Sequence, residues 1–346
     1  MPRPLSEAAP VHREAMKRQV LALDIGGTKL AAAVVGEDGA LSDRHVIETA
    51  VGDGAERVLE SALELVAGVL ESQPGDARPR VLGVSTKGLT REEGVLLSGM
   101  PGWSGLRIPA MLRQRFPGLT FATLNDVKAA TLAELVWGSL RGVSHGLYVN
   151  LGTGIAAGIV ADGRLVDGAH GAAGEIGYLV PERSMLSRCR PPGTELPAPL
   201  EGLVGGGAVP RRARAALGKE LTMAQLVAES RDDPGATELV EDILSELVLW
   251  VVNVSVVLDP ERVVIGGGFL GGGPEVCRKI AKALDSSAPF SPEVLPAHFG
   301  TESALVGAGA LAFSMLEPAG LSGRSRRGTS TRFPIRLTTE LKESSP

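Results

Sequence analysis

The sequence predicts a two-domain α/β protein with a ligand-binding cleft between its domains. Its 346 residues are too many for one ordinary domain and suit two. Two similar strand–glycine turn–strand units, about 125 residues apart, indicate a duplicated domain, although any α/β protein contains several glycine turns. Each copy would present one loop to the shared cleft. The expected boundaries are a flexible arm (1–18), an N-terminal domain (19–125), a C-terminal domain (126–316) and a disordered tail (317–346).

The predicted N-terminal domain opens with a hairpin, because short apolar runs at 20–23 and 30–35 flank Gly26-Gly27. Residues 54–71 carry apolar side chains at helical spacing and predict an amphipathic helix. Residues 81–85 and 119–124 predict two buried strands. The second strand leads through Asn125-Asp126 into a helix expected at 127–140.

The predicted C-terminal domain repeats this opening, with strands at 146–151 and 155–160 around a glycine turn. Apolar periodicity predicts helices at 200–217, 222–229 and 237–258. A strand at 262–265, a glycine cluster at 266–273 and helices at 274–284 and 303–316 complete the expected elements.

Composition argues against several classes of protein. The formal net charge of −5 disfavours a nucleic-acid binder, which normally carries a basic face. Two cysteines, Cys189 and Cys277, form neither a disulfide framework nor a CxxC pattern, which suits a cytoplasmic protein. No apolar run predicts a membrane helix, and the N-terminus lacks the apolar core of a signal peptide.

The first glycine turn, DIGGTK (Asp24 to Lys29), predicts a phosphate-binding loop. Gly26 and Gly27 allow the backbone to approach an anion closely, and Thr28 and Lys29 add donors. Asp24 ends a strand, where its carboxylate would hold Mg²⁺, usually through water. The alternative is an ordinary hairpin turn, for which Gly-Gly is common.

Two later glycine loops carry the same chemistry. Gly152, Thr153 and Gly154 form the second, and Gly266, Gly267 and Gly268 begin the third. Both half-match a dinucleotide fingerprint, but a strand is expected after Gly154, and Asp285 falls at a helix end rather than a strand end. No GxxxxGK[ST] motif occurs. The distribution of loops over both halves favours a nucleotide held in the interdomain cleft.

These motifs, in this order, resemble the ROK family (repressors, open reading frames, kinases) over roughly residues 18 to 316. The matching segments are Asp24 to Lys29, Leu124-Asn125-Asp126 with Ala129, Ala130 and Glu134, Leu151 to Ile155, Asp162 to Leu165, Gly171 to Gly177, Leu200-Glu201, Asp259 to Glu261, Val264 to Gly268 and Gly307 to Gly309.

The resemblance implies an actin/hexokinase-like (ASKHA, ribonuclease H-like) fold and a homodimer. It implies ATP- and Mg²⁺-dependent phosphorylation of a hexose-type sugar, whether a glucokinase-like substrate or an amino or N-acetyl sugar. Asp126 would be the general base, although Asn-Asp before an apolar helix also suits an N-cap. The implied sugar contacts are Asn125, Asp126, Glu175, Tyr178 and Glu201. The implied ATP contacts are Gly26, Gly27, Thr28, Lys29, Gly152, Thr153 and Gly154, with Gly266, Gly267 and Gly268 at the adenosine.

The chain departs from the family pattern around the sugar site. Tyr178 stands where the family has a histidine that ligates zinc, and Cys189 is the only thiol in the segment of the family's cysteine-rich loop, so no zinc is expected. Lys87 and Lys128 occupy positions at which the family has proline and asparagine. Both lysines are interpreted either as solvated surface charges or as groups that recognise an acidic or phosphorylated substrate.

The favoured function is therefore a sugar kinase that acts on small molecules. A transcriptional repressor of the same family would need a helix-turn-helix segment, for which residues 1–18 leave no room. The other alternative is a catalytically silent sugar sensor or scaffold. Loss of the histidine and the zinc loop motivates it, whereas retention of Asp24, Asp126 and Glu175 argues against it.

Overall fold

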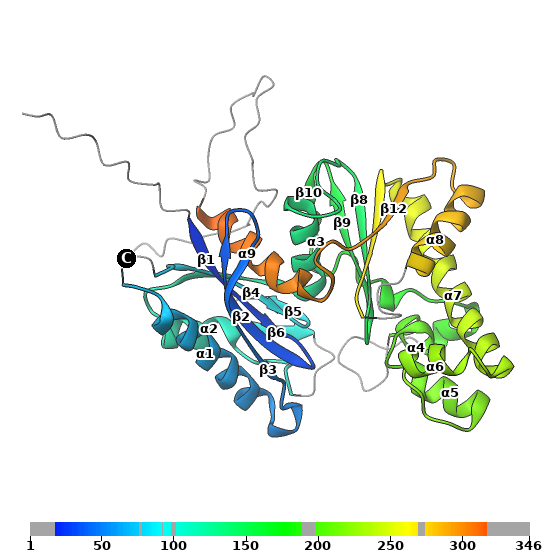
Figure 1. Ribbon diagram of the computed structural model, residues 1–346, viewed down its shortest axis with the longest axis horizontal. Coiled ribbons are helices and arrows are strands. Elements are labelled where there is room, and N and C mark those ends of the chain that lie inside the picture. Colours follow the sequence, from blue (N-terminus) through cyan, green and yellow to red (C-terminus); the bar gives the residue numbers. More distant parts are fainter. Residues whose placement is uncertain are drawn as a thin grey trace, which may run out of the picture.

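The computed structural model describes residues 18–75, 78–91, 93–97, 102–188, 198–268 and 274–316. The predicted arm, apart from Arg18, and the predicted tail lie outside these residues. The described chain forms two lobes, each built on a five-stranded sheet with helices packed against it (Figure 1).

The sheet of the first lobe has the strand order β3-β2-β1-β4-β7. β1 is antiparallel to β2 and parallel to β4, which is in turn parallel to β7. Its strands are β1 (Gln19–Ile25), β2 (Lys29–Gly36), β3 (Leu41–Glu48), β4 (Val81–Thr86) and β7 (Thr120–Asn125). The lobe also contains η1 (Val51–Asp53), α1 (Ala55–Ser72), α2 (Ile108–Arg115) and a small hairpin of β5 (Leu89–Arg91) and β6 (Gly94–Leu97).

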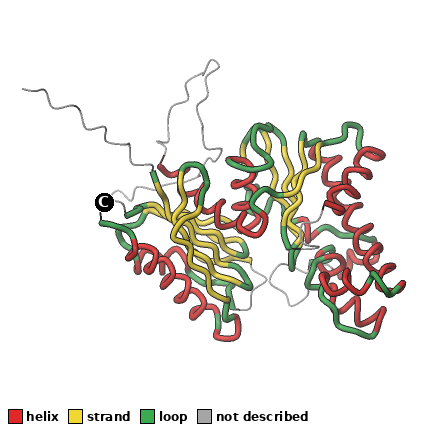
Figure 2. Tube along the Cα trace, viewed as in Figure 1, coloured by secondary structure: helices red, strands yellow, loops and turns green. Residues whose placement is uncertain are grey.

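The sheet of the second lobe repeats this plan in the order β10-β9-β8-β11-β12 (Figure 2). An antiparallel meander again occupies one side and parallel strands the other. The duplication predicted from the two glycine hairpins is therefore confirmed at the level of topology. The strands are β8 (Gly146–Leu151), β9 (Ile155–Ala161), β10 (Arg164–Leu165), β11 (Arg262–Gly266) and β12 (Glu293–Pro296).

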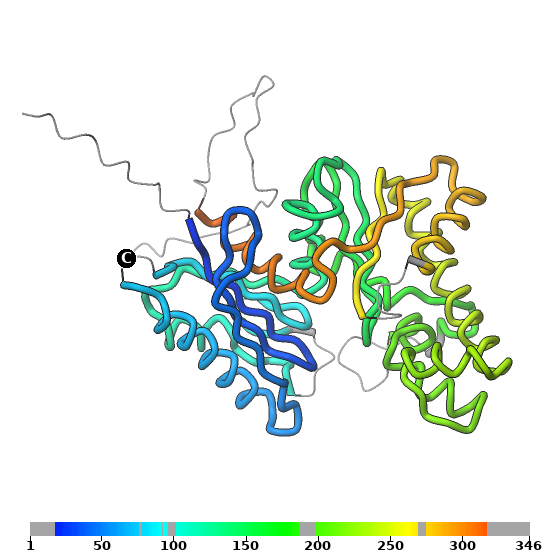
Figure 3. Tube along the Cα trace, in the orientation of Figure 1, coloured from blue at the N-terminus to red at the C-terminus, as the bar shows by residue number. Residues whose placement is uncertain are grey.

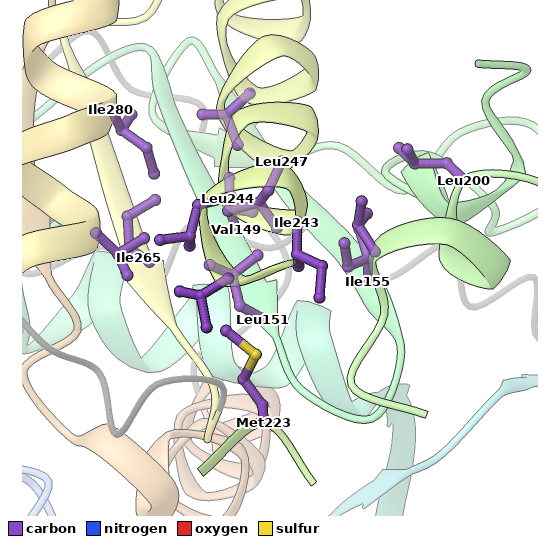
Figure 4. Packing of buried hydrophobic residues seen from close by; sticks show 14 of the residues in the cluster. Val149, Leu151, Ile155, Leu200, Met223, Ile243, Leu244, Leu247, Ile265 and Ile280 are labelled. Carbon is purple, nitrogen blue, oxygen red and sulfur yellow. The ribbon is translucent and has the colours of Figure 1, made fainter. Parts of the chain in front are cut away.

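The helices of the second lobe include one long and several short segments. They are η2 (Ile176–Tyr178), η3 (Arg183–Arg188), α4 (Glu201–Val204), α5 (Val209–Leu217), α6 (Met223–Glu229), α7 (Pro234–Leu258), α8 (Pro274–Ser287) and η5 (Gly300–Glu302). Buried side chains of α6, α7 and α8 pack against β8, β9 and β11, as Figure 4 shows for Met223, Ile243, Leu244, Val149 and Ile265. This apolar core holds the second glycine hairpin in place.

Helices α3 (Asp126–Val136) and α9 (Ser303–Leu316) lie against each other between the two sheets. Although α9 follows the second lobe in sequence, the chain crosses back and packs it on β1 and β4 (Figure 3). Glycines make this packing close: a β-carbon on Gly307 would lie 1.7 Å from the carbonyl oxygen of Ala129, and one on Gly83 would lie 1.8 Å from that of Ala308. The helix that ends the second lobe thus completes the first.

Several elements differ from the sequence prediction. The helix expected at 200–217 is two helices, because Gly205, Gly206 and Gly207 interrupt it, and the helix expected at 127–140 already ends at Val136. β3, α2, β10, β12 and the β5–β6 hairpin were not predicted. β3 exposes most of its side chains and so lacks an apolar pattern, while β10 and β12 are too short to show one.

Candidate active site

The carboxyl ends of three parallel strands form one edge of the first sheet. The register pairs Ile25 of β1 with Thr86 of β4, and Thr86 with Asn125 of β7, so the strands end level. The residues that follow them, Gly26, Lys87 and Asp126, therefore emerge side by side. Ligands of open α/β sheets bind at such an edge.

Asp24 is the residue before Ile25, the last residue of β1, and it is 7% exposed. Burial raises its pKa from 3.8 to about 7, and the charges of Asp126 and Glu302 add to the shift. The hydroxyl of Ser85 opposes it by donating a hydrogen bond of 2.8 Å to Oδ1. A desolvated carboxylate among other carboxylates is favoured in its charged form by a nearby cation, so the surroundings of Asp24 fit Mg²⁺.

Residues 26–28, here called loop one, turn tightly between β1 and β2. The amide of Gly26 donates to the carbonyl oxygen of Lys29 at 3.1 Å, whereas the amides of Gly27 and Thr28 find no acceptor among the described residues. The side chain of Lys29 turns to the opposite lobe, where Nζ contacts the carbonyl oxygen of Thr301 (3.2 Å) and Oε1 of Glu302 (3.3 Å). The structure thus brings the open amides of loop one to the edge, but not the ammonium of Lys29.

Residues 152–154, here called loop two, occupy the equivalent position in the second lobe. The Gly152 amide bonds to the Gly154 carbonyl oxygen at 3.0 Å, and again two consecutive amides, of Thr153 and Gly154, have no acceptor in the described chain. Two antiparallel hairpins with exposed consecutive amides are suited to an anion. Because the strand β9 follows Gly154 directly, the dinucleotide alternative is wrong for this loop.

Loop two is braced by a turn that the sequence analysis did not identify. The amides of Gly206 and Gly207, between α4 and α5, donate to the carbonyl oxygens of Gly152 (2.9 Å) and Thr153 (2.8 Å). The signal was present as three consecutive glycines, but it was interpreted as part of a helix. These glycine amides therefore help to fix the backbone of loop two.

In the third glycine segment, Gly266 and Gly267 are packed closely against other residues, whereas Gly268 is not. A β-carbon on Gly266 would lie 2.1 Å from the Tyr148 hydroxyl, and one on Gly267, whose φ is +92°, 2.2 Å from the Leu151 carbonyl oxygen. Packing against β8 therefore requires both glycines. Gly268 alone faces open space, and residues 269–273 lie outside the described chain.

Asn125, rather than Asp126, caps helix α3. Its Oδ1 accepts hydrogen bonds from the amides of Val127 (3.0 Å) and Lys128 (3.2 Å). Asp126 is the first helical residue and accepts from the Val127 amide at 3.0 Å. Burial raises the pKa of Asp126, while the charge of Lys87 and this amide lower it. The helix start thus holds a carboxylate with raised pKa at the sheet edge.

The expected sugar contacts of the second lobe lie together beside Asp126. Burial raises the pKa of Glu175 to about 7, the charges of Asp126 and Glu201 add to this, and Lys128 opposes it. Burial, Glu175 and Glu201 also raise the pKa of Tyr178. Oε2 of Glu201 accepts from the Ile155 amide at 3.1 Å, so this carboxylate braces loop two as well as facing the cluster.

Lys128 shows that both interpretations of this lysine were wrong. Its side chain is 3% exposed, so it is no surface charge. Its Nζ donates to the carbonyl oxygens of Asp167 (2.9 Å) and Gly171 (2.6 Å) and to Oδ1 of Asp167. All three ammonium protons are engaged, which leaves none for a substrate. Lys128 instead anchors the 167–175 loop, which ends at Glu175.

The expected lack of zinc remains a prediction from the sequence, because Cys189 lies outside the described residues. Within the part of the chain that is described, no group of three or more His, Cys, Asp and Glu side chains is arranged to hold a metal ion. None of the helices described is long and apolar enough to cross a membrane.

Comparison with known proteins identifies the family. The model of the ROK family matches residues 20–314. The chain belongs to the ROK family. It is 30% identical over 296 residues to an N-acetylmannosamine kinase of Vibrio cholerae serotype O1, covering 84% of this chain and 98% of that protein. It is 31% identical over 303 residues to a kanosamine kinase of Amycolatopsis mediterranei, covering 84% and 95%.

The actin/hexokinase-like fold expected from the sequence is confirmed by solved ROK structures. A ROK family glucokinase from Streptomyces griseus, in complex with glucose and AMPPNP, is 25% identical and superimposes with a TM-score of 0.71. The match covers 86% of this chain and 99% of that one.

Proposed function

We propose that this ROK protein transfers the γ-phosphate of ATP to a hydroxyl of a hexose-type sugar, with Asp126 as the general base. Its relatives include an N-acetylmannosamine kinase and a kanosamine kinase, and the Streptomyces griseus structure contains AMPPNP, an analogue of ATP. The protein is accordingly a sugar kinase. The observation that supports the site is the position of Asp126, level with loop one at the sheet edge and close to Glu175.

In the proposed reaction, Glu175, Tyr178, Glu201 and the Nδ2 group of Asn125 bind sugar hydroxyls. The reacting hydroxyl gives its proton to Asp126, and its oxygen forms a bond to the γ-phosphorus. The bond from that phosphorus to the β–γ bridging oxygen breaks, and ADP leaves. A carboxylate whose pKa is raised above that of an ordinary aspartate is a stronger base.

The nucleotide would lie between the lobes. We propose that the open amides of loops one and two bind its phosphates, with Gly268 at the adenosine. Asp24 would hold Mg²⁺, usually through water, and the ion would neutralise phosphate charge. A cytoplasmic location where ATP is available, a homodimer and the lack of zinc are further parts of this proposal. The names of these relatives are compatible with an amino sugar, an N-acetyl sugar or glucose as the substrate.

The test of the base is Asp126→Asn, assayed by coupled ADP release over a panel of hexoses, amino sugars and N-acetylated sugars with MgATP. The amide keeps the size of the side chain and can still contact the hydroxyl, but it cannot accept the proton. We expect kcat to fall by on the order of 10² to 10⁴, with a modest change in KM. Because Asn125 is the helix cap, the variant should keep its thermal stability.

The matched control is Asp162→Asn, in an exposed turn where the side chain is 92% exposed and φ is +52°, a conformation that asparagine tolerates. It should leave kcat unchanged. A folded Asp126→Asn protein that turns over as fast as wild type would exclude Asp126 as the base. A wild type that binds sugar but transfers no phosphate would instead favour the silent sensor.

A further inference from the structure

Lys87 follows the central strand of the three that end level at the sheet edge. β4 lies between β1, which leads into loop one, and β7, which leads to Asp126. The backbone confirms the alignment, because the Lys87 amide donates to the Ile25 carbonyl oxygen at 3.2 Å. Whatever side chain stands at position 87 therefore rises between the first glycine loop and the proposed base.

The ammonium of Lys87 reaches back over loop one. A β-carbon built on Gly27 would have Cδ and Nζ of Lys87 at 3.8 Å, the nearest described atoms outside residues 26–28. The positive charge of Lys87 also acts on the carboxyl group of Asp126 and lowers its pKa. Nζ thus lies within reach of both the exposed amides of Gly27 and Thr28 and the proposed base.

The space between these two groups is where phosphoryl transfer has to occur. The acceptor hydroxyl must lie within hydrogen-bond reach of Asp126, and the γ-phosphate must lie over loop one, so the transferring group passes between them. The same region already holds the carboxyl groups of Asp24, Asp126 and Glu175. The negative charge of Asp126 raises the pKa of both Asp24 and Glu175. A triphosphate adds more negative charge, which a fixed cation offsets.

We propose that Lys87 is a catalytic residue that binds the γ-phosphate oxygens of ATP and stabilises the charge on the phosphoryl group during transfer. The proposal rests on the proposed kinase function and deepens it. Lys87 keeps its proton and forms no covalent bond. It does the work that an arginine or lysine supplied at the γ-phosphate does in other phosphotransferases. The position of Nζ over loop one, rather than over the Glu175 cluster, favours the nucleotide over an acidic sugar as its partner.

The test compares Lys87→Met and Lys87→Arg with wild type and with Lys282→Met, a control on the exposed surface of α8. Titration calorimetry with ADP and with AMPPNP separates the β- from the γ-phosphate contribution, and initial rates with MgATP give kcat. We expect Lys87→Met to weaken AMPPNP binding about tenfold or more, to change ADP binding less than about twofold, and to lower kcat by about 10² to 10³. Lys87→Arg should recover much of the rate because it keeps the charge.

Three results would overturn the proposal. One is an unchanged kcat and AMPPNP affinity in Lys87→Met, and another is an equal loss of ADP and AMPPNP affinity. The third is a loss of rate only with acidic or phosphorylated acceptors, which would show that Lys87 recognises the acceptor instead. Failure of the proposed function is distinguishable. A wild type that phosphorylates no sugar would refute the kinase, while the comparison of AMPPNP with ADP would still test Lys87.

Discussion

Replacing Lys128 with methionine removes a buried charge that anchors the 167–175 loop to helix α3. The change keeps most of the side-chain length and deletes three hydrogen bonds, two to the carbonyl oxygens of Asp167 and Gly171 and one to the Asp167 carboxylate. The loop ends at Glu175, so its anchor and the expected sugar contact are connected by a few residues of backbone. We expect both stability and sugar binding to respond.

The magnitude follows from the burial of each partner. Removing one member of a fully buried ion pair costs about 3–5 kcal/mol, because the other charge is left without compensation. Here the Asp167 side chain is 58% exposed and regains water, so that part of the cost is small. Two carbonyl oxygens lose a charged donor, at about 1.5–3 kcal/mol each, offset by the relief of burying an ammonium group. We therefore expect a loss of about 2–3 kcal/mol in the free energy of unfolding.

Denaturant unfolding and steady-state kinetics check both effects, with Lys282→Met as the matched surface control. We expect KM for the sugar to rise about tenfold and KM for ATP to change little, because the loop ends at Glu175, a proposed sugar contact, and not at a proposed ATP contact. Unchanged stability would refute the anchoring role of Lys128. A loss of stability with an unchanged sugar KM would show that the anchor does not position Glu175.

Two further predictions concern packing and pH. Gly307→Ala should lower the free energy of unfolding by about 3 kcal/mol, because its β-carbon would overlap the Ala129 carbonyl. The control Gly68→Ala, in open space on α1, should raise it by about 0.5–1 kcal/mol. Equal effects of the two substitutions would contradict the close contact of α3 with α9. The raised pKa of Glu175 means that the folded ligand-free protein retains a proton that the unfolded chain loses above its ordinary pKa of 4.5. Stability should fall as pH rises from there to about 7, and Glu175→Gln, which cannot ionise, should be more stable than wild type at pH 8 but not near pH 4; superimposable profiles from thermal unfolding would refute this.

The motifs around the site could be predicted from sequence because each is local. A glycine turn between two apolar runs predicts a hairpin with exposed amides, and Asn-Asp before an apolar stretch predicts a capped helix start. These patterns located loop one, loop two and Asp126, and the repeated hairpin indicated the duplication. The Gly205–Gly207 turn was missed because glycines inside a periodic segment do not say whether a helix continues through them.

Only the tertiary structure decided which charges meet. Lys128 looked like an ordinary polar residue on a helix, yet contacts with residues about 40 positions away bury it, and no local pattern encodes burial from the opposite side. Lys29, inside the phosphate motif, pairs with Glu302 at a separation of 273 residues. The level ends of β1, β4 and β7, which place Lys87 between loop one and Asp126, follow from strand register, which is set by pairing between distant segments rather than by any one of them.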